Sequence, residues 1–242
     1  MKGIGVFLAT MFALVAWAAG QQAAKPATPV PSTPVVIKPG GPSLRGKLIY
    51  RSLGLGAPDG RVDAGSRGDG DEVASLYVIA PENVGLTIRA QPSVYWYQTA
   101  PAQLPFEISI LKPNDPTPVM LVRQTGATTR GFHHLDLGEH GVTLAPGTDY
   151  QWVVALVRDP QSRSKDIVSS GWIRHTQPSE STALRQDAAG YAAAGYWYDT
   201  ITALFAQIEA HPQDAQLAAD RRDLFAQVGL PPLPVIPAIK RR

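Results

Sequence analysis

The chain has no cysteine among its 242 residues. Disulfide-stapled scaffolds, thiolate metal sites, cysteine nucleophiles and lipoproteins anchored through a modified cysteine are therefore excluded. The net charge is also small, at +2, and the longest run of basic residues is the terminal Lys240–Arg242. Because a nucleic-acid-binding protein needs a clustered basic surface, we expect no nucleic-acid partner.

Catalytic motifs are scarce as well. There is no Gly-x-Ser-x-Gly nucleophile motif, and Ser169 and Ser170 precede Gly171 inside an expected strand. The glycine-rich "GLGAPDG" lacks the Lys-Ser/Thr of a phosphate-binding loop, and the acidic residues that follow lack the spacing of a calcium loop. We therefore predict a protein that is not an enzyme, with no cofactor and no catalytic residue.

The N-terminal residues 1–20 form an apolar segment. They carry one charge, on Lys2, and end in small residues, which is the pattern of a secretory signal peptide. Glycine, threonine and alanine dilute the segment, whereas a membrane anchor needs about 18 or more strongly apolar residues. We expect a cleaved leader, no stable membrane span after cleavage, and a location in the periplasm or at the cell surface. A retained anchor is the alternative.

Two segments are too rich in proline to form a core. Residues 21–46 hold six prolines and no aromatic residue, which predicts an extended linker. Residues 231–242 form a proline-rich, basic tail. Between them, residues 54–71 are glycine-rich and predict an irregular loop, in which Arg61 and Arg67 would hold the loop to carboxylates or carbonyls of the folded part.

Residues 47–177 have the pattern of an antiparallel β-sandwich. Short segments of β-branched and aromatic residues alternate with Pro, Gly and Asn turns. In "FEISILK", Phe106, Ile108 and Ile110 would share one face of a half-buried strand. The expected strands are Val73–Ala80, Leu86–Ala90, Ser93–Thr99, Phe106–Lys112, Val119–Gln124, Phe132–Leu137, Tyr150–Val157 and Asp166–His175.

The stretch "LAPGTDYQW" narrows the fold class. In immunoglobulin-like sandwiches a tyrosine at a strand corner bonds its hydroxyl to upstream backbone, and Tyr150 stands at such a position. Trp152 then begins the longest apolar strand. We predict a mainly β protein with an immunoglobulin- or fibronectin-like antiparallel sandwich, in which Tyr150 and Trp152 are structural.

The hydrophobic period changes from two to 3.6 after the sandwich, so residues 178–230 predict a short helical segment of three helices. In "YWYDTITALFAQIEA", Trp197 begins a buried stripe that continues every three or four residues. Gly195 would end the preceding helix and Asp214 would cap the last one. A 34-residue offset maps Tyr191 onto Phe225 and resembles a tetratricopeptide unit. One and a half units cannot bury a solenoid face, so we expect the helices to pack on the sandwich or to bind a partner.

Three blocks of the sequence occur together in one known family. They are "GAPDGRVDAGSRG" at 56–68, "RDPQSRSKDIVSSGWI" at 158–173, and "YAAAGYWYDTITAL" at 191–204. In these blocks the chain resembles the domain of unknown function 928 family, which is found in exported bacterial proteins. The resemblance implies an exported location and a sandwich followed by helices, and it implies no activity and no catalytic residue.

Two runs of aromatic residues raise the question of a binding platform. "VYWYQT" and "GYWYDT" together hold four of the eight tyrosines. On a strand, Tyr95 and Tyr97 would share one face, whereas on a helix Tyr196 would lie on the outer side with small or polar neighbours. We favour packing in the core for these runs, with Trp197 and Gly195 structural. Tyr95, Tyr97 and above all Tyr196 are the candidate binding rings.

The cluster "FHHLDLGEH" contains three of the five histidines. Adjacent histidines on a strand point to opposite faces, and no established metal-ligand spacing is present. We predict no metal, with His134 and His140 as weak candidates only.

The segment "RDPQSRSKD" joins two expected strands through a charged turn. Such a tip is usually only solvated, but sandwiches also present binding residues on their end loops. Arg158, Arg163 and Lys165 are therefore candidate contacts.

These observations lead to one functional hypothesis and two alternatives. We expect an exported, non-enzymatic envelope protein that binds a protein partner. A module for envelope polysaccharide is the first alternative, and it requires exposed, coplanar tyrosines. A metal-dependent hydrolase is the second, and it requires convergent histidines beside a cleft.

Overall fold

The computed structural model describes residues 47–56, 60–62, 74–178 and 185–234. The predicted signal peptide, the predicted linker, Arg67 and the end of the predicted tail lie outside the described residues. Among the described residues, no helix is both long enough and apolar enough to span a membrane.

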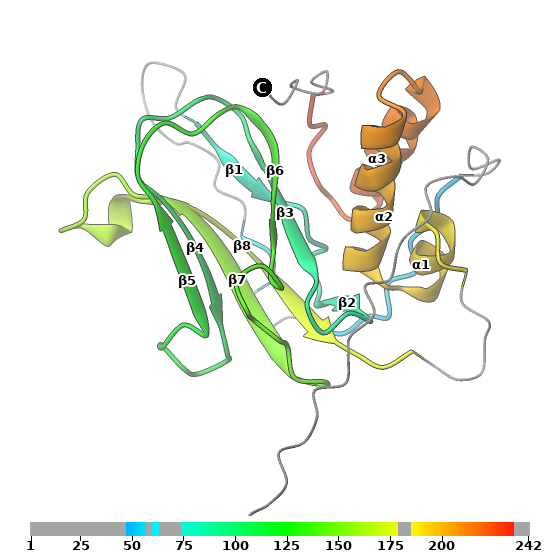
Figure 1. The fold of residues 1–242 in the computed structure, drawn as a ribbon, viewed down its shortest axis with the longest axis horizontal. Helices are drawn as coiled ribbons and strands as arrows, with labels where there is room; N and C mark the ends of the chain where they lie inside the picture. Colours follow the sequence, from blue (N-terminus) through cyan, green and yellow to red (C-terminus); the bar gives the residue numbers. More distant parts are fainter. Residues whose placement is uncertain (1–46, 57–59, 63–73, 179–184, 235–242) are drawn as a thin grey trace, which may run out of the picture. The chain divides into compact units, whose positions relative to one another are not determined.

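In the described residues, eight strands form two sheets (Figure 1). The smaller sheet has the order β1 (Leu76–Val78), β3 (Ser93–Gln98), β6 (Gly131–Asp136). The larger has the order β2 (Gly85–Thr87), β8 (Ile167–His175), β7 (Asp149–Leu156), β4 (Phe106–Leu111), β5 (Met120–Gln124). All pairs are antiparallel except β2 with β8. The mainly β prediction is confirmed, with two sheets followed by helices.

The alternation of β4 places its apolar residues between the sheets. Phe106, Ile108 and Ile110 are each at most 5% exposed, while the residues between them are half-buried. Their ladder partners in β7 include Trp152, which is fully buried. The predicted strand face is therefore the inner face of the larger sheet.

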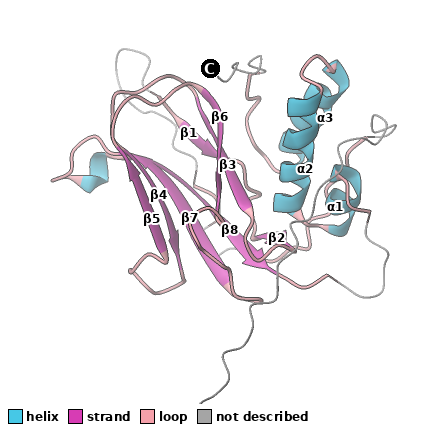
Figure 2. Ribbon diagram, in the orientation of Figure 1, coloured by secondary structure: helices cyan, strands magenta, loops and turns pink. Residues whose placement is uncertain are grey.

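Three helices follow the strands (Figure 2). Asp187 caps α1 (Ala188–Ala194) by accepting from the backbone N–H of Gly190, and Gly195 ends it with a φ of 83°. α2 (Trp197–Ala210) follows at once, and Asp214 caps α3 (Ala215–Gln227) as predicted. The described residues contain three α-helices, so the likeness to a tetratricopeptide repeat extends no further in the structure.

The helices α2 and α3 cover the outer face of the smaller sheet (Figure 1). Phe205 of α2 lies against Tyr95 and Phe132, with ring centroids 4.9 and 5.1 Å apart. On the opposite face of the same sheet, Trp96 stacks on Phe106 at 5.2 Å. Every residue of β3 is therefore buried, because the strand lies between the larger sheet and the helical layer.

The predicted tyrosine corner is present. Tyr150 is 2% exposed, and its hydroxyl accepts a hydrogen bond of 3.2 Å from the backbone N–H of Ala145. This bond fixes the turn that leads into β7 and fits the immunoglobulin-like pattern.

Residues 47–53, which precede the first strand, hydrogen-bond to the helices. The side chain of Gln227 accepts from the backbone N–H of Tyr50 at 2.9 Å and donates to the carbonyl of Leu48 at 2.7 Å. Arg51 donates its backbone N–H to the carbonyl of Ala192. This segment thereby joins α1 to α3.

Candidate binding surface

The helical run "GYWYDT" forms the junction between helices and sandwich. The indole N–H of Trp197 donates to the carbonyl of Ile79 at 2.8 Å. The hydroxyl of Tyr198 accepts from the indole of Trp152 at 2.8 Å and donates to the carbonyl of Trp172 at 2.9 Å. These buried hydrogen bonds join the first turn of α2 to the sandwich, and the side chains of Trp152 and Trp197 are both fully buried.

Tyr196 is not the exposed ring that the helix pattern predicted. It is 8% exposed and packs with Leu86 and Tyr191. The face of α2 that looked polar is covered by α1 and β2, and Thr200 on that face is fully buried, with its hydroxyl bonded to the carbonyl of Tyr196. The periodicity of one helix cannot show that neighbouring elements cover its polar side.

Tyr95 and Tyr97 are also unavailable as surface rings. They are 8% and 0% exposed, since the helical layer covers their face of β3. A sugar-stacking platform made of Tyr95, Tyr97 or Tyr196 is therefore absent from the described structure.

The histidines of β6 point to opposite faces, as predicted. His133 stacks on Trp96 and its ring nitrogen Nε2 hydrogen-bonds to the carbonyl of Thr129 at 2.8 Å, while His134 stacks on Tyr95. Burial lowers the pKa of His133 below its ordinary value. In the described part of the chain no group of three or more His, Asp or Glu side chains could hold a metal ion, so His134 and His140 gain no support as ligands.

Asp199 is a buried charge that the sequence analysis did not single out. It is 1% exposed, it accepts from the backbone N–H of Ile88 at 3.0 Å, and Arg89 lies 3.3 Å from its other oxygen. Burial raises the pKa of this carboxyl above its ordinary value. The group ties the turn after β2 to the first turn of α2, which is a structural role.

Arg61, in the described part of the glycine-rich segment, bonds to backbone carbonyls, as predicted for this residue. Its guanidinium donates to the carbonyl oxygens of Ala80 at 3.0 Å and Val228 at 2.9 Å, and also to that of Gly229. One side chain thereby links residues 60–62 to Ala80, after β1, and to the end of α3.

The charged hairpin between β7 and β8 is exposed and internally paired. Arg158, Arg163 and Lys165 all lie at the surface, and η1 (Arg163–Lys165) forms the tip. Arg163 binds Glu107 of β4 at 2.6 Å and Asp166 at 2.6 Å. The hydrogen bond from Arg163 lowers the pKa of Glu107, and the same carboxylate raises the pKa of Arg163.

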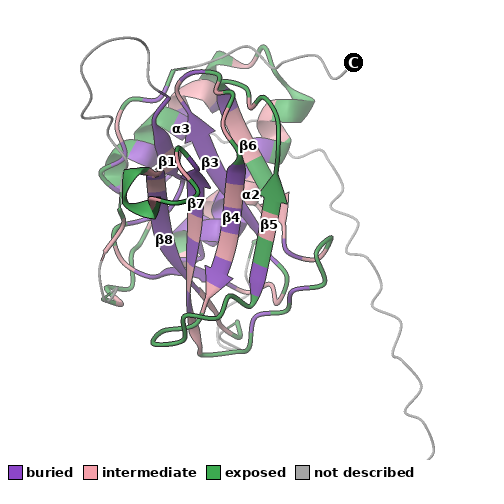
Figure 3. Cartoon of the chain, turned by 90° about the vertical axis from the view of Figure 1, so that its left-hand side faces the viewer, coloured by how far each residue is buried: buried purple, intermediate pink, exposed green. Residues whose placement is uncertain are grey.

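Glu107 also connects the hairpin to the edge strand β5. Its oxygen Oε1 accepts from Nε of Arg123 at 2.9 Å. Two residues before Arg123, Leu121 is 41% exposed, and Val119 is 44% exposed. We call Val119, Leu121, Arg123, Glu107 and Arg163 the β5 surface. Figure 3 shows β5 as an exposed edge beside the more buried strands β4 and β7.

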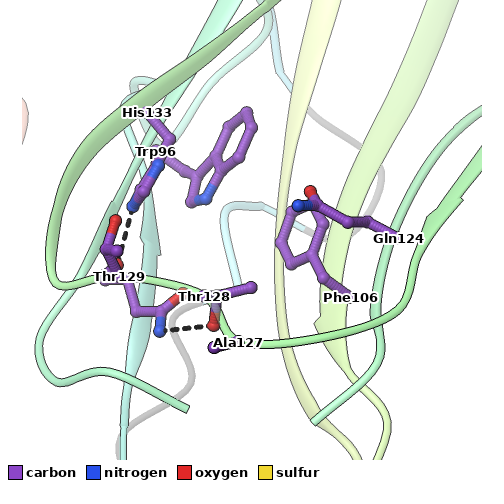
Figure 4. A pocket seen from close by; sticks show the side chains of 8 residues that line it. Trp96, Phe106, Gln124, Ala127, Thr128, Thr129 and His133 are labelled. Atoms are coloured by element: carbon purple, nitrogen blue, oxygen red, sulfur yellow. Dashed lines mark hydrogen bonds between the residues drawn. The ribbon is translucent and has the colours of Figure 1, made fainter. Parts of the chain in front are cut away.

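A cavity opens between the two sheets next to the same edge. Its volume is about 220 Å³. Trp96 and His133 come from the smaller sheet, Phe106 and Gln124 from the larger, and the connection through Ala127 to Thr129 closes one end (Figure 4). We call this cavity the aromatic slot.

Sequence reasoning found the hairpin cations but missed the β5 surface and the aromatic slot. Alternation in "FEISILK" already placed Glu107 outward and Phe106 inward. The sequence did not show which strand lies beside β4. Glu107 meets Arg123 only through the register of the β4–β5 ladder.

The described residues form two mainly antiparallel sheets with a layer of helices against the smaller one. The family model named Domain of Unknown Function (DUF928) matches residues 62–235. The chain belongs to this family. A search of curated proteins finds no match to it.

Proposed function

We propose that the chain is an exported, non-enzymatic protein of the cell envelope that binds a protein partner through the β5 surface. The proposal includes a cleaved signal peptide and a location in the periplasm or at the cell surface. It also includes a tetratricopeptide-type origin for the helices, which here serve to brace the smaller sheet rather than to bind.

The exposed edge of β5 carries the proposal. β5 is the last strand of its sheet, so one side of its backbone faces no other strand among the described residues. Leu121 and Val119 add apolar area, and the arginines beside them are held in place by Glu107. An apolar centre with an ordered charged rim is the composition of a protein interface.

A protein partner is favoured over polysaccharide by the burial of the three candidate tyrosines. Sugar binding would need an exposed ring, whereas the large hydrophobic side chains exposed on this face are the aliphatic Leu121 and Val119.

Affinity capture from the native envelope tests the proposal. The wild-type chain should recover a partner that Leu121→Lys and Arg163→Ala lose. Leu53→Lys is the matched control, because Leu53 is 59% exposed but lies outside the β5 surface. If all variants retained the partner equally, the binding site would lie outside the β5 surface. If only polysaccharide were recovered, the proposal of a protein partner would be wrong.

A further inference from the structure

The guanidinium of Arg221 is a buried cation without a counter-ion. Arg221 belongs to α3 and is 4% exposed, and its guanidinium lies over the ring of Phe132 in β6, 4.6 Å from the ring centroid. Its Nη2 has no hydrogen-bond partner, and it forms no salt bridge with a described residue. Buried arginines are normally paired with carboxylate, phosphate or carbonyl oxygens, so this one lacks an acceptor.

The hydroxyl of Tyr97 is a second unpaired donor beside the same ring. Tyr97 is fully buried and faces Phe132 across the β3–β6 ladder, with ring centroids 4.8 Å apart. Its hydroxyl has no hydrogen-bond partner among the described residues. Because both side chains contact Phe132, Arg221 and Tyr97 border one region between α3 and the smaller sheet.

The charges next to Arg221 in the sequence do not supply the missing acceptor. The buried carboxylate of Asp220 accepts from the side chain of Gln216 at 2.8 Å through Oδ1, and its Oδ2 reaches no donor. On the other side, Arg222 adds a second positive charge. Burial first, and then the charge of Arg222, lower the pKa of Arg221 below its ordinary value. A negative group beside the guanidinium would therefore be attracted.

The chemistry of this region favours a carboxylate with a single charge. Two unpaired donors match the two oxygens of a carboxylate, and hydrogen bonds to a charged oxygen are stronger than neutral ones. One negative charge balances one guanidinium, whereas a dianion would leave a surplus charge beside Phe132 and Phe225, whose ring centroids are 6.1 Å apart. Phe132 is half-buried on β6, the last strand of its sheet among the described residues, so this region lies near the surface.

We infer that the chain binds a small monocarboxylate between α3 and the smaller sheet, with one oxygen on the guanidinium of Arg221 and the other on the hydroxyl of Tyr97. This site goes beyond the proposed function and shares no residue with the β5 surface. Without the ligand, the uncompensated guanidinium lowers the stability of the fold. The bound carboxylate pairs the cation, so binding and stability are linked.

Thermal unfolding of the full chain in sodium butyrate tests the inference. Sodium chloride at the same ionic strength is the reference, and sodium phosphate is the control for a dianion. Butyrate should raise the melting temperature of wild type in a saturable way, by about 5 °C or more at 100 times its Kd, and phosphate should act no more strongly than chloride. A rise in butyrate no larger than in chloride would overturn the inference, and an equal saturable rise in phosphate would overturn the choice of a monocarboxylate.

Three variants locate the response in the same assay. Arg221→Met should melt at a higher temperature than wild type without butyrate and should not respond to it, because an apolar side chain replaces an uncompensated buried charge. Arg222→Met is the matched control, since Arg222 is the exposed neighbouring cation, and it should keep the response. Tyr97→Phe should melt like wild type but bind butyrate about tenfold more weakly, because one hydrogen bond to the carboxylate is lost.

Other results with these variants would contradict the site. If Arg221→Met melted at a lower temperature than wild type without butyrate, or kept the response, Arg221 would not hold the carboxylate. If Arg222→Met lost the response as well, the effect would be one of general charge. If Tyr97→Phe bound butyrate as tightly as wild type, the second contact would be wrong.

Discussion

The junction between helices and sandwich depends on one phenolic hydroxyl, which makes a matched pair of substitutions informative. Tyr198 is 1% exposed, and its hydroxyl bonds to both the Trp152 indole and the Trp172 carbonyl. Tyr97 is also fully buried, but its hydroxyl has no hydrogen-bond partner among the described residues. The same change, tyrosine to phenylalanine, therefore has opposite expected consequences at the two positions.

Tyr198→Phe leaves a buried donor and a buried acceptor unpaired. Each such group costs about 1–3 kcal/mol, so the free energy of unfolding should fall by about 2–4 kcal/mol after partial relaxation. Tyr97→Phe removes a hydroxyl that is buried without a partner, which should change stability by less than about 1 kcal/mol or increase it. The cavity made by loss of one oxygen is small in both cases.

Urea denaturation followed by tryptophan fluorescence measures both free energies on the full chain. We expect Tyr198→Phe to be at least about 1.5 kcal/mol less stable than Tyr97→Phe. Equal losses, or a larger loss for Tyr97→Phe, would refute the assignment of the junction to the hydroxyl of Tyr198.

Three further predictions concern Asp199, Gly85 and Glu107. The pKa of Asp199 is raised in the folded state, so its contribution to stability is greatest below its unfolded pKa and is lost as pH rises through the folded pKa. Asp199→Asn keeps an acceptor for the backbone N–H of Ile88. In urea titrations between about pH 4 and pH 7, the free energy of unfolding of this variant should depend less on pH than that of wild type. A Cβ at Gly85 would lie 2.7 Å from the ring of Tyr198, so Gly85→Ala should lower the unfolding free energy by about 1–3 kcal/mol, and an unchanged melting temperature would contradict the close approach. Glu107 has a lowered pKa, so its contribution to stability is present above its unfolded pKa and is lost as pH falls through the folded pKa. In urea denaturation at neutral pH, Glu107→Gln should lower the free energy of unfolding by less than about 1 kcal/mol, because its arginine partners are exposed.

Local features of the fold were predictable from the sequence because short-range rules determine them. The alternation of Phe106, Ile108 and Ile110 gave a strand and its inner face, and Asp214 and Gly195 marked helix ends through capping. Tyr150 identified the corner because its hydroxyl bond reaches only five residues upstream.

The candidate site was less predictable because it depends on contacts between distant segments. Glu107 binds Arg163, 56 residues away, and only the strand order brings these two side chains together. Tyr196 was expected at the surface because its own helix offered small and polar neighbours, whereas β2 and α1 cover it. The hydrophobic period of one helix cannot show that a further layer of structure buries its polar side.

Site-specific photo-cross-linking tests the central claim that the β5 surface binds a protein partner. A photoreactive phenylalanine analogue would replace Leu121 or Val119, with His211 as the control, because His211 is exposed at the end of α2 and outside the β5 surface. After irradiation in intact cells, we expect one discrete protein adduct at positions 119 and 121 and none at 211. Adducts at 211 alone, or none at any position with a correctly folded chain, would contradict it.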